Sequence, residues 1–182
     1  MVDGAESAEK PGADHPGVSV LVVMGVSGVG KTTIAKALAR RLRAAFADGD
    51  DFHPPANVAK MSTGTPLTDA DRGPWLAAIA AWIDARRAAG ERGVVACSAL
   101  KRHYRAVLAD GRPDVGIVYL RGPKALIANR LGGRRNHFMP PNLLDSQIAT
   151  LEPPDDDERP ITVDAALPPK RIVDAVVARI GA

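Results

Sequence analysis

The sequence has few of the features that would mark a secreted, membrane-spanning or base-stacking protein. Its single cysteine, Cys97, cannot form an intramolecular disulfide, which favours a reducing compartment such as the cytoplasm. Aromatic residues make up only 4% of the chain, too few for the stacking platforms that hold single-stranded nucleic acid. No apolar run approaches the roughly 20 residues of a membrane span. We therefore expect neither a membrane nor a nucleic acid as partner.

The start of the chain also lacks the basic residues and the apolar stretch of a signal peptide. Residues 1–17 carry four acidic side chains: Asp3, Glu6, Glu9 and Asp14. We expect a disordered tail there, followed by one domain over residues 18–182. Of the 182 residues, 46% are hydrophobic and 25% charged, which suits one α/β domain with an adequate core. The net charge of +3 is a mild excess that suits phosphate binding.

Residues 25–32, Gly-Val-Ser-Gly-Val-Gly-Lys-Thr, fit the pattern G-x-x-x-x-G-K-[ST], the phosphate-binding loop of nucleotide hydrolases and kinases. An apolar, β-branched run at 18–24 precedes the loop and predicts a buried parallel strand. Residues 33–42 follow it with apolar positions at helical spacing, so strand, loop and helix are all present. We expect the nucleotide phosphates to be held by Gly25, Ser27, Gly28, Val29, Gly30, Lys31, Thr32 and Thr33.

Each part of the loop has a chemical reason. The glycines let backbone N–H groups approach an anion, and the following helix adds the positive end of its dipole. Lys31 supplies a positive charge that can reach the β- and γ-phosphates. The Thr32 hydroxyl can ligate Mg²⁺.

A second polar cluster lies in residues 46–55, where three aspartates and a histidine meet a turn signal at the expected end of a short strand. In a parallel sheet this end faces the ligand crevice. Carboxylates beside a phosphate-binding loop can hold hydrated Mg²⁺ or take a proton from a hydroxyl acceptor. The alternative is a solvated acidic turn.

Residues 62–76 predict the start of a helix. Thr68 and Asp71 have the spacing of a capping box, and Pro74 suits a first helical turn. The apolar stripe that follows is predicted to be core: Trp75, Leu76, Ile79, Trp82 and Ile83. Arg72 can grip an anionic group of a substrate, or it can pair with Asp69 or Asp71 at the surface.

Two further buried strands are predicted over residues 93–100 and 115–120, a short one over 161–164, and a closing amphipathic helix over 172–180. We expect Cys97 to be a small buried apolar residue and not a nucleophile. A basic cluster between glycines and prolines, at about residues 130–142, reads as a mobile lid whose arginines close over the phosphates. The alternative is a basic surface loop that touches nucleic acid.

Together these residues resemble the gluconokinases, members of the shikimate-kinase-like group of nucleoside-monophosphate-kinase folds. The similarity runs from Val20 to Ile180. It rests on the loop at 25–32, Asp48-Gly49-Asp50 with His53-Pro54, Asn57 with Lys60-Met61, Gly64 with Pro66-Leu67, Asp69 with Asp71-Arg72 and Pro74-Trp75-Leu76, Cys97-Ser98-Ala99-Leu100-Lys101 with Tyr104-Arg105, Arg134 with His137-Phe138, and Leu151-Glu152-Pro153.

The resemblance implies a three-layer α/β/α P-loop kinase with a mainly parallel sheet and a helical lid. It also implies ATP-dependent phosphorylation of D-gluconate to 6-phosphogluconate, which feeds the pentose phosphate pathway, in a homodimer. The implied catalytic residues are Lys31, Asp50 and Arg134. Thr32 and Asp48 would hold Mg²⁺, and Arg130 would serve the nucleotide from the lid. The implied acceptor contacts are Asp50, His53, Lys60, Arg72, Lys101 and His137.

Two other interpretations stay open at this point. One is a kinase of the same fold that acts on another acceptor, such as shikimate or a nucleoside monophosphate. The other is a nucleotide-gated binding protein whose basic loop holds nucleic acid, although the sequence has no recognisable nucleic-acid motif.

Overall fold

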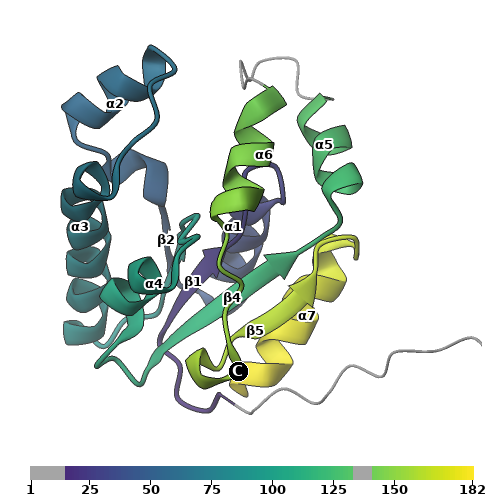
Figure 1. The fold of residues 1–182 in the computed structure, drawn as a ribbon. Helices are drawn as coiled ribbons and strands as arrows, with labels where there is room; N and C mark the ends of the chain where they lie inside the picture. Colours follow the sequence, from purple (N-terminus) through teal and green to yellow (C-terminus); the bar gives the residue numbers. More distant parts are fainter. Residues whose placement is uncertain (1–14, 133–140) are drawn as a thin grey trace, which may run out of the picture.

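The computed structural model describes residues 15–132 and 141–182. Within these residues five strands form one sheet in the order β2-β3-β1-β4-β5, and every neighbouring pair is parallel (Figure 1). The strands are β1 (Val20–Met24), β2 (Ala45–Asp48), β3 (Gly93–Ala96), β4 (Val115–Arg121) and β5 (Ile161–Asp164). The predicted parallel α/β fold is confirmed.

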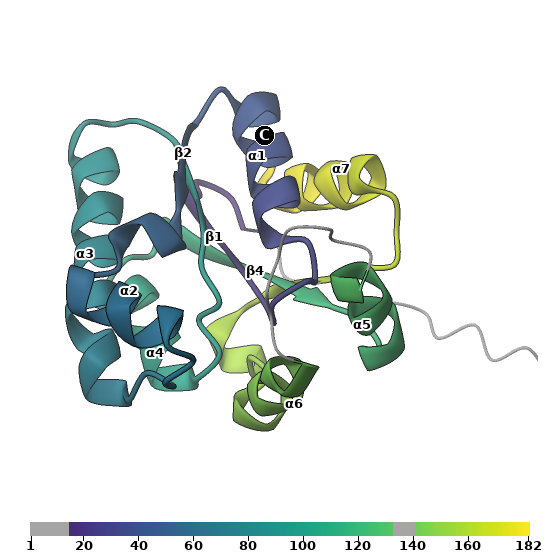
Figure 2. The same cartoon turned by 90° about the horizontal axis from the view of Figure 1, so that it is seen from above.

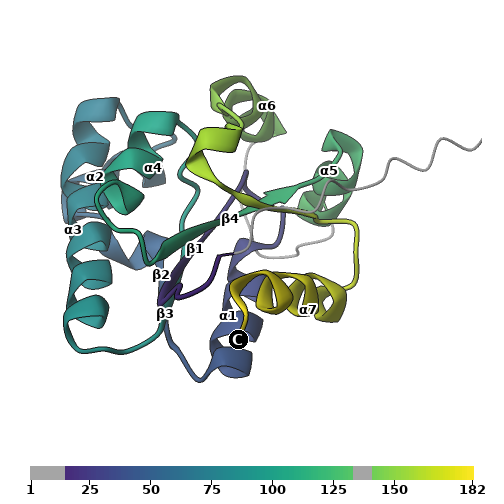
Figure 3. The same cartoon turned by 90° about the horizontal axis from the view of Figure 1, so that it is seen from below.

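Helices cover both faces of this sheet. They are α1 (Lys31–Leu42), α2 (Pro55–Ser62), α3 (Asp69–Ala88), α4 (Arg102–Ala109), α5 (Lys124–Gly132), α6 (Pro141–Thr150) and α7 (Pro169–Ile180), with short 3₁₀ turns at η1 (Gly49–Phe52) and η2 (Asp156–Glu158). Viewed from above and below, α1 and α7 lie on one face and α3 and α4 on the other (Figures 2 and 3). The domain therefore has three layers, α/β/α.

The central strand β1 explains why both layers are needed. Successive side chains of a strand point to opposite faces of its sheet. Leu21 and Val23 join the core under α1 and α7, whereas Val20, Val22 and Met24 join the core under α3 and α4. All five are almost fully buried. An unbroken apolar run is thus what a parallel strand with two covered faces requires.

The start of α3 confirms one prediction and corrects another. Thr68 and Asp71 form the capping box, each side chain accepting a hydrogen bond from the other residue's backbone N–H. Because this cap starts the helix at Asp69, Pro74 lies inside the helix and not in its first turn. The missing N–H of Pro74 costs the helix one backbone hydrogen bond. Also, α2 forms over residues for which the sequence predicted no helix.

The structure describes only part of the expected tail and part of the expected lid. His15 is buried and donates its backbone N–H to Arg179 O of α7, so the packed chain extends at least to His15. Residues 1–14 of the expected tail, and residues 133–140 of the expected lid, lie outside the described residues. The described parts of the lid region are the end of α5 and helix α6. In the ranges that the structure describes, no helix combines the length and apolarity needed to cross a membrane.

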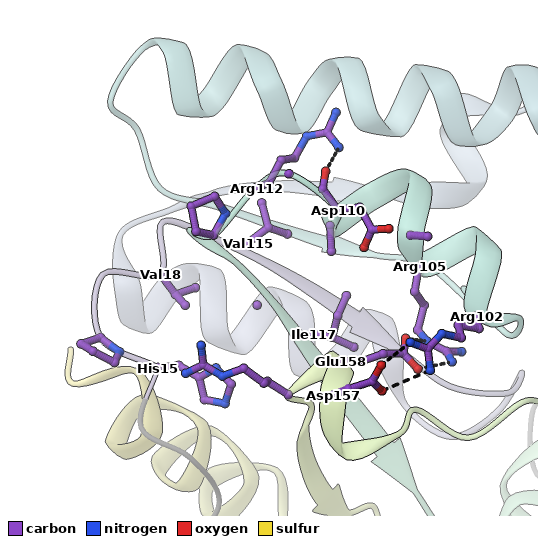
Figure 4. A pocket seen from close by; sticks show the side chains of 17 residues that line it. His15, Val18, Arg102, Arg105, Asp110, Arg112, Val115, Ile117, Asp157 and Glu158 are labelled. Atoms are coloured by element: carbon purple, nitrogen blue, oxygen red, sulfur yellow. Dashed lines mark hydrogen bonds and ion pairs between the residues drawn. The ribbon is translucent and has the colours of Figure 1, made fainter.

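A cavity of about 440 Å³ opens beside the start of β4, at the end of the sheet away from residues 25–32 (Figure 4). Three of the arginines that line it are paired with carboxylates: Arg102 with Asp157, Arg105 with Glu158, and Arg112 with Asp84. These three guanidinium groups are therefore engaged within the protein.

Arg105 is the most buried of these arginines, with 1% of its surface exposed. Its Nη2 donates to Glu158 Oε1 at 2.8 Å, and its Nη1 donates to the carbonyls of Ala99, Leu100 and Glu152. The guanidinium thereby ties α4 to the chain before β5. A buried charge with this many partners is costly to remove, because its partners lose their hydrogen bonds.

We predict that Arg105→Ala lowers the free energy of unfolding by about 3–5 kcal/mol in urea titration, because Glu158 and three carbonyls lose their donor. The control is Lys170→Ala on α7, whose side chain is 86% exposed and pairs with Asp174. That change should cost about 0–1 kcal/mol. Equal losses for the two variants would contradict a structural role for Arg105.

Candidate active site

A cavity of about 760 Å³ lies at the carboxyl end of the sheet. One wall is the loop of residues 25–32 and the start of α1, and a second comes from η1 and the start of α3. The third wall is α6. Among the lining residues are Ser27, Lys31, Thr32, Asp48, Asp50, His53, Arg72, Trp75, Ser98, Tyr104 and Gln147. This is the edge at which parallel α/β sheets bind ligands.

The loop of residues 25–32 is held by its buried side chains and by one close backbone approach. Val26 and Val29 are both buried in the core under α1. A Cβ atom on Gly25 would lie 2.8 Å from Leu120 O, and its φ of +141° also favours glycine. Helix α1 starts after Gly30 with no side-chain cap on its first N–H groups. Such a helix start suits an anion.

Lys31 and Thr32 come directly after the last glycine of this loop, and both line the cavity. Lys31 Nζ donates to Val26 O at 3.1 Å, so the ammonium group lies over the loop itself. Thr32 Oγ1 donates to Asp48 Oδ2 at 3.1 Å. The hydroxyl and the carboxylate that were predicted to hold Mg²⁺ are therefore neighbours, although 16 positions separate them in the sequence.

Asp48 and Asp50 are positioned by the glycine between them. A Cβ on Gly49 would lie 2.5 Å from Ala96 O, so only glycine fits where β2 ends against β3. The Gly49 carbonyl accepts a 2.6 Å hydrogen bond from Trp75 Nε1, and Asp48 Oδ1 accepts one from Asp50 N at 3.2 Å. The backbone of the acidic turn is thus fixed at the cavity, and the Asp50 side chain remains exposed there.

His53 and Arg72 form the wall opposite α6. The His53 ring stacks on Trp75 with the ring centroids 4.6 Å apart. Burial lowers the pKa of His53, the charge of Arg72 lowers it further, and Asp50 opposes them. The imidazole is therefore neutral at pH 7.

Arg72 does not form the surface ion pair with Asp69 or Asp71 that the sequence allowed. Its Nη1 donates to Leu67 O, and its guanidinium lies 5.8 Å from the centre of the Tyr104 ring. Asp71 pairs instead with Lys60 at 2.6 Å, and Asp69 with Lys101 at 2.8 Å. The guanidinium thus lines the cavity, as an anion-binding group would.

The same ion pairs engage Lys60 and Lys101. Both were expected to contact the acceptor, but neither is among the residues that line the cavity. Each ammonium group instead pairs with a carboxylate in the first turn of α3.

The remaining expected site residues divide into three groups. Arg130 donates to Val29 O at 3.0 Å and to Ala165 O at 2.8 Å, so it fastens the loop to the chain after β5. Thr33 is exposed on α1 and lies outside the cavity lining. Arg134 and His137 fall in the range that the structure does not describe.

Three cavity residues were not predicted to act at the site. Trp75 is 3% exposed, which confirms its place in the core, yet it also positions Gly49 and His53. Tyr104 donates its hydroxyl to Asp69 and packs under Arg72. Gln147 accepts a hydrogen bond from Ser27 N at 2.6 Å. Trp75 and Tyr104 both belong to the blocks that carry the family resemblance, but nothing in the sequence marks Gln147.

Cys97 lines the floor of the cavity but is not a nucleophile. Burial raises the pKa of its thiol to about 12, so it stays protonated at neutral pH. The prediction of a small buried apolar residue is confirmed.

Known proteins share this arrangement over most of the chain. A family model described as an AAA domain matches residues 20–154. The gluconokinase of Gluconobacter oxydans is 50% identical over 157 residues, covering 86% of this chain and 88% of that protein. The thermoresistant gluconokinase of Escherichia coli is 42% identical, covering 79% of this chain and 82% of that protein. The chain belongs to the gluconokinase family.

Solved structures agree with membership of the gluconokinase family. A gluconokinase from Sinorhizobium meliloti is 44% identical with a TM-score of 0.78, covering 92% of this chain and 93% of that one. An unliganded sugar kinase from Janibacter is 48% identical with a TM-score of 0.83, covering 89% and 94%. The shikimate kinase of Aquifex aeolicus, at 15% identity and a TM-score of 0.54, shares the fold alone. The predicted resemblance and the P-loop kinase fold are confirmed.

We predict that Gly49→Ala lowers the free energy of unfolding by about 1–3 kcal/mol, because the backbone at Ala96 cannot yield to a new methyl group. The matched control is Gly73→Ala in α3, where a Cβ meets no atom within 4 Å. Alanine there should be neutral or stabilise the helix by up to about 1 kcal/mol. Urea unfolding of both variants measures the difference. An unchanged free energy of unfolding in Gly49→Ala would mean that the acidic turn can shift to make room for the methyl group.

Proposed function

We propose that this protein transfers the γ-phosphoryl group of ATP to the 6-hydroxyl of D-gluconate, giving 6-phospho-D-gluconate and ADP. The observation that carries the proposal is one cavity that joins the Lys31–Thr32 end of the phosphate-binding loop to Asp50, His53 and Arg72. Membership of the gluconokinase family supports gluconate as the acceptor.

On the nucleotide side, Lys31 and the loop N–H groups would hold the β- and γ-phosphates. Thr32 and Asp48 would hold Mg²⁺, which neutralises phosphate charge when bound. The donor set fits this ion: among the described residues no group of three or more His, Cys, Asp or Glu side chains forms a metal cage. One hydroxyl and one carboxylate suit an ion that keeps water and phosphate oxygens as its other ligands.

On the acceptor side, gluconate carries one carboxylate and a row of hydroxyls. Arg72 can bind the carboxylate through two parallel hydrogen bonds. His53 Nδ1 lies 3.4 Å from Asn57 Nδ2, which leaves Nε2 to donate to a hydroxyl of gluconate. Asp50, exposed at the edge of the cavity, can accept the proton of the 6-hydroxyl.

In the transfer step, the 6-hydroxyl oxygen forms a bond to the γ-phosphorus while the bond from phosphorus to the β–γ bridging oxygen breaks. The hydroxyl proton passes to the Asp50 carboxylate, and ADP leaves with the electron pair of the broken bond. We propose that Arg134 neutralises charge on the transferred group, that His137 contacts gluconate, and that Arg130 keeps the loop in shape.

We also propose that the protein works as a cytoplasmic homodimer. The gluconokinase resemblance supports the dimer, and the single cysteine supports a reducing compartment. Light scattering on the purified chain measures the oligomeric state, and a monomer at micromolar concentration would oppose the dimer.

The function is tested by ADP formation with Mg-ATP and parallel acceptors: D-gluconate, D-glucose, shikimate and AMP. Strong turnover with gluconate alone is the expected result. D-glucose is the sharpest control because it keeps the 6-hydroxyl and lacks the carboxylate for Arg72. Preferred turnover of shikimate or AMP would keep the phosphate chemistry and overturn the acceptor.

We predict that Lys31→Ala lowers kcat by at least about 100-fold, because a charge at the transferred phosphoryl group is lost. Its melting temperature should stay near that of the wild type, because Lys31 is only partly buried. The control is Arg40→Ala, an exposed cation on the same helix, which should keep full turnover. Near-normal kcat in Lys31→Ala would remove the lysine from the reaction.

For Asp50→Asn we predict a fall in kcat of about 10²–10⁴ with the Kd for ATP unchanged, because the amide cannot accept a proton. Steady-state kinetics and calorimetric titration with ATP check the two parts separately. Weakened ATP binding together with an unchanged kcat would place Asp50 on the nucleotide side instead.

A further inference from the structure

Gln147 joins helix α6 to the phosphate-binding loop by a direct hydrogen bond. Its Oε1 accepts from the backbone N–H of Ser27 at 2.6 Å, across 120 positions of sequence. Ser27 belongs to the loop whose N–H groups are expected to face phosphate. One such N–H is therefore already occupied by a neutral side chain from the opposite wall of the cavity.

The position of Gln147 is fixed by the anchoring of α6. Leu144 is buried in the core under α1, and the Gln147 carbonyl accepts from Leu151 N at 2.9 Å. Just after the helix, Glu152 N donates to Leu100 O, and the Glu152 carboxylate accepts from Arg102 N at 2.7 Å. The carboxyl half of α6 is thus tied to the body of the domain.

The placement of Gln147 on the helix also argues against a packing role. It lies three residues after Leu144 and four before Leu151, on the side of α6 that faces the domain. The neighbouring Ile148 is 37% exposed. A helix that served packing alone would turn the isoleucine inward and the glutamine out.

We propose that Gln147 binds the γ-phosphoryl group of ATP while it holds Ser27 in place. A side-chain amide carries an acceptor oxygen and a donor nitrogen on the same carbon. With the oxygen on Ser27 N–H, the nitrogen is close to the loop and belongs to a residue that lines the same cavity as Lys31, Thr32 and Asp50. This inference rests on the proposed transfer from ATP.

The chemistry explains why glutamine suits this position. A glutamate of the same shape could still accept from Ser27 N–H, but its charge would repel the γ-phosphate and it could donate nothing. A leucine would lose both hydrogen bonds. ADP lacks the γ-phosphoryl group, so it should not sense the amide nitrogen.

The experiment compares Kd values for Mg-ATP and Mg-ADP by calorimetric titration of the wild type, Gln147→Glu and Gln147→Leu, without gluconate. We expect Gln147→Glu to weaken ATP binding by about tenfold or more, with ADP binding changed by less than about twofold. Gln147→Leu should weaken ATP less than glutamate does. The matched control, Ile148→Ala on the same helix, should leave both Kd values unchanged.

Two results would overturn the proposal. Equal weakening of ATP and ADP would mean that Gln147 only supports the shape of the loop. Unchanged binding of both nucleotides in Gln147→Glu would show that the side chain does not reach the γ-phosphoryl group. Melting temperatures of all variants show whether each is folded, and Gln147→Leu carries the test if the glutamate variant is not.

The test is independent of the proposed acceptor. Because both titrations omit gluconate, the ratio of the two Kd values answers the question about Gln147 by itself. Failure of the wild type to phosphorylate gluconate would refute the proposed function and leave the comparison of ATP with ADP intact.

Discussion

The hydrogen bond from Thr32 to Asp48 joins the two halves of the site, and the rest of the arrangement depends on it. Thr32 follows β1 and Asp48 ends β2, but β3 lies between these two strands. The two side chains can meet because β3 ends at Ala96 and does not extend between them. The chain after β3 passes beneath the phosphate-binding loop, where Gly25 N donates a hydrogen bond to Ser98 O. Gly49 completes the fit, since any side chain there would collide with the end of β3.

The same arrangement of strands decides where the walls of the cavity lie. The walls of the cavity come from opposite sides of the sheet edge: the start of α3 on one side and α6 on the other. The wall formed by η1 and the start of α3 is held together by Trp75, which contacts both the Gly49 carbonyl and the His53 ring. A phosphoryl transfer enzyme gains most of its rate from such positioning and from charge neutralisation, so a site assembled from four separate segments needs a rigid frame.

The sequence predicted those features that depend on local pattern. The run of apolar residues before Gly25, the loop itself and the capping box at Thr68 all appear in the structure as expected, because each is decided by neighbours within a few positions. The ion pairs of Lys60 and Lys101 were not predicted, since their partners in the first turn of α3 are brought to them by the fold. Gln147 was missed for the same reason: Ser27, which donates to it, lies 120 positions away in sequence and is brought to it by the packing of α6.

The proposed arrangement places the terminal hydroxyl of gluconate between the Asp50 carboxylate and the γ-phosphate of ATP. The most direct measurement is the NMR spectrum of the product formed from Mg-ATP and D-gluconate, because carbon–phosphorus coupling identifies the esterified oxygen. We predict coupling at the terminal CH₂ carbon, as in 6-phospho-D-gluconate. A phosphate on any other hydroxyl, or ADP without a phosphorylated sugar acid, would contradict the proposed arrangement.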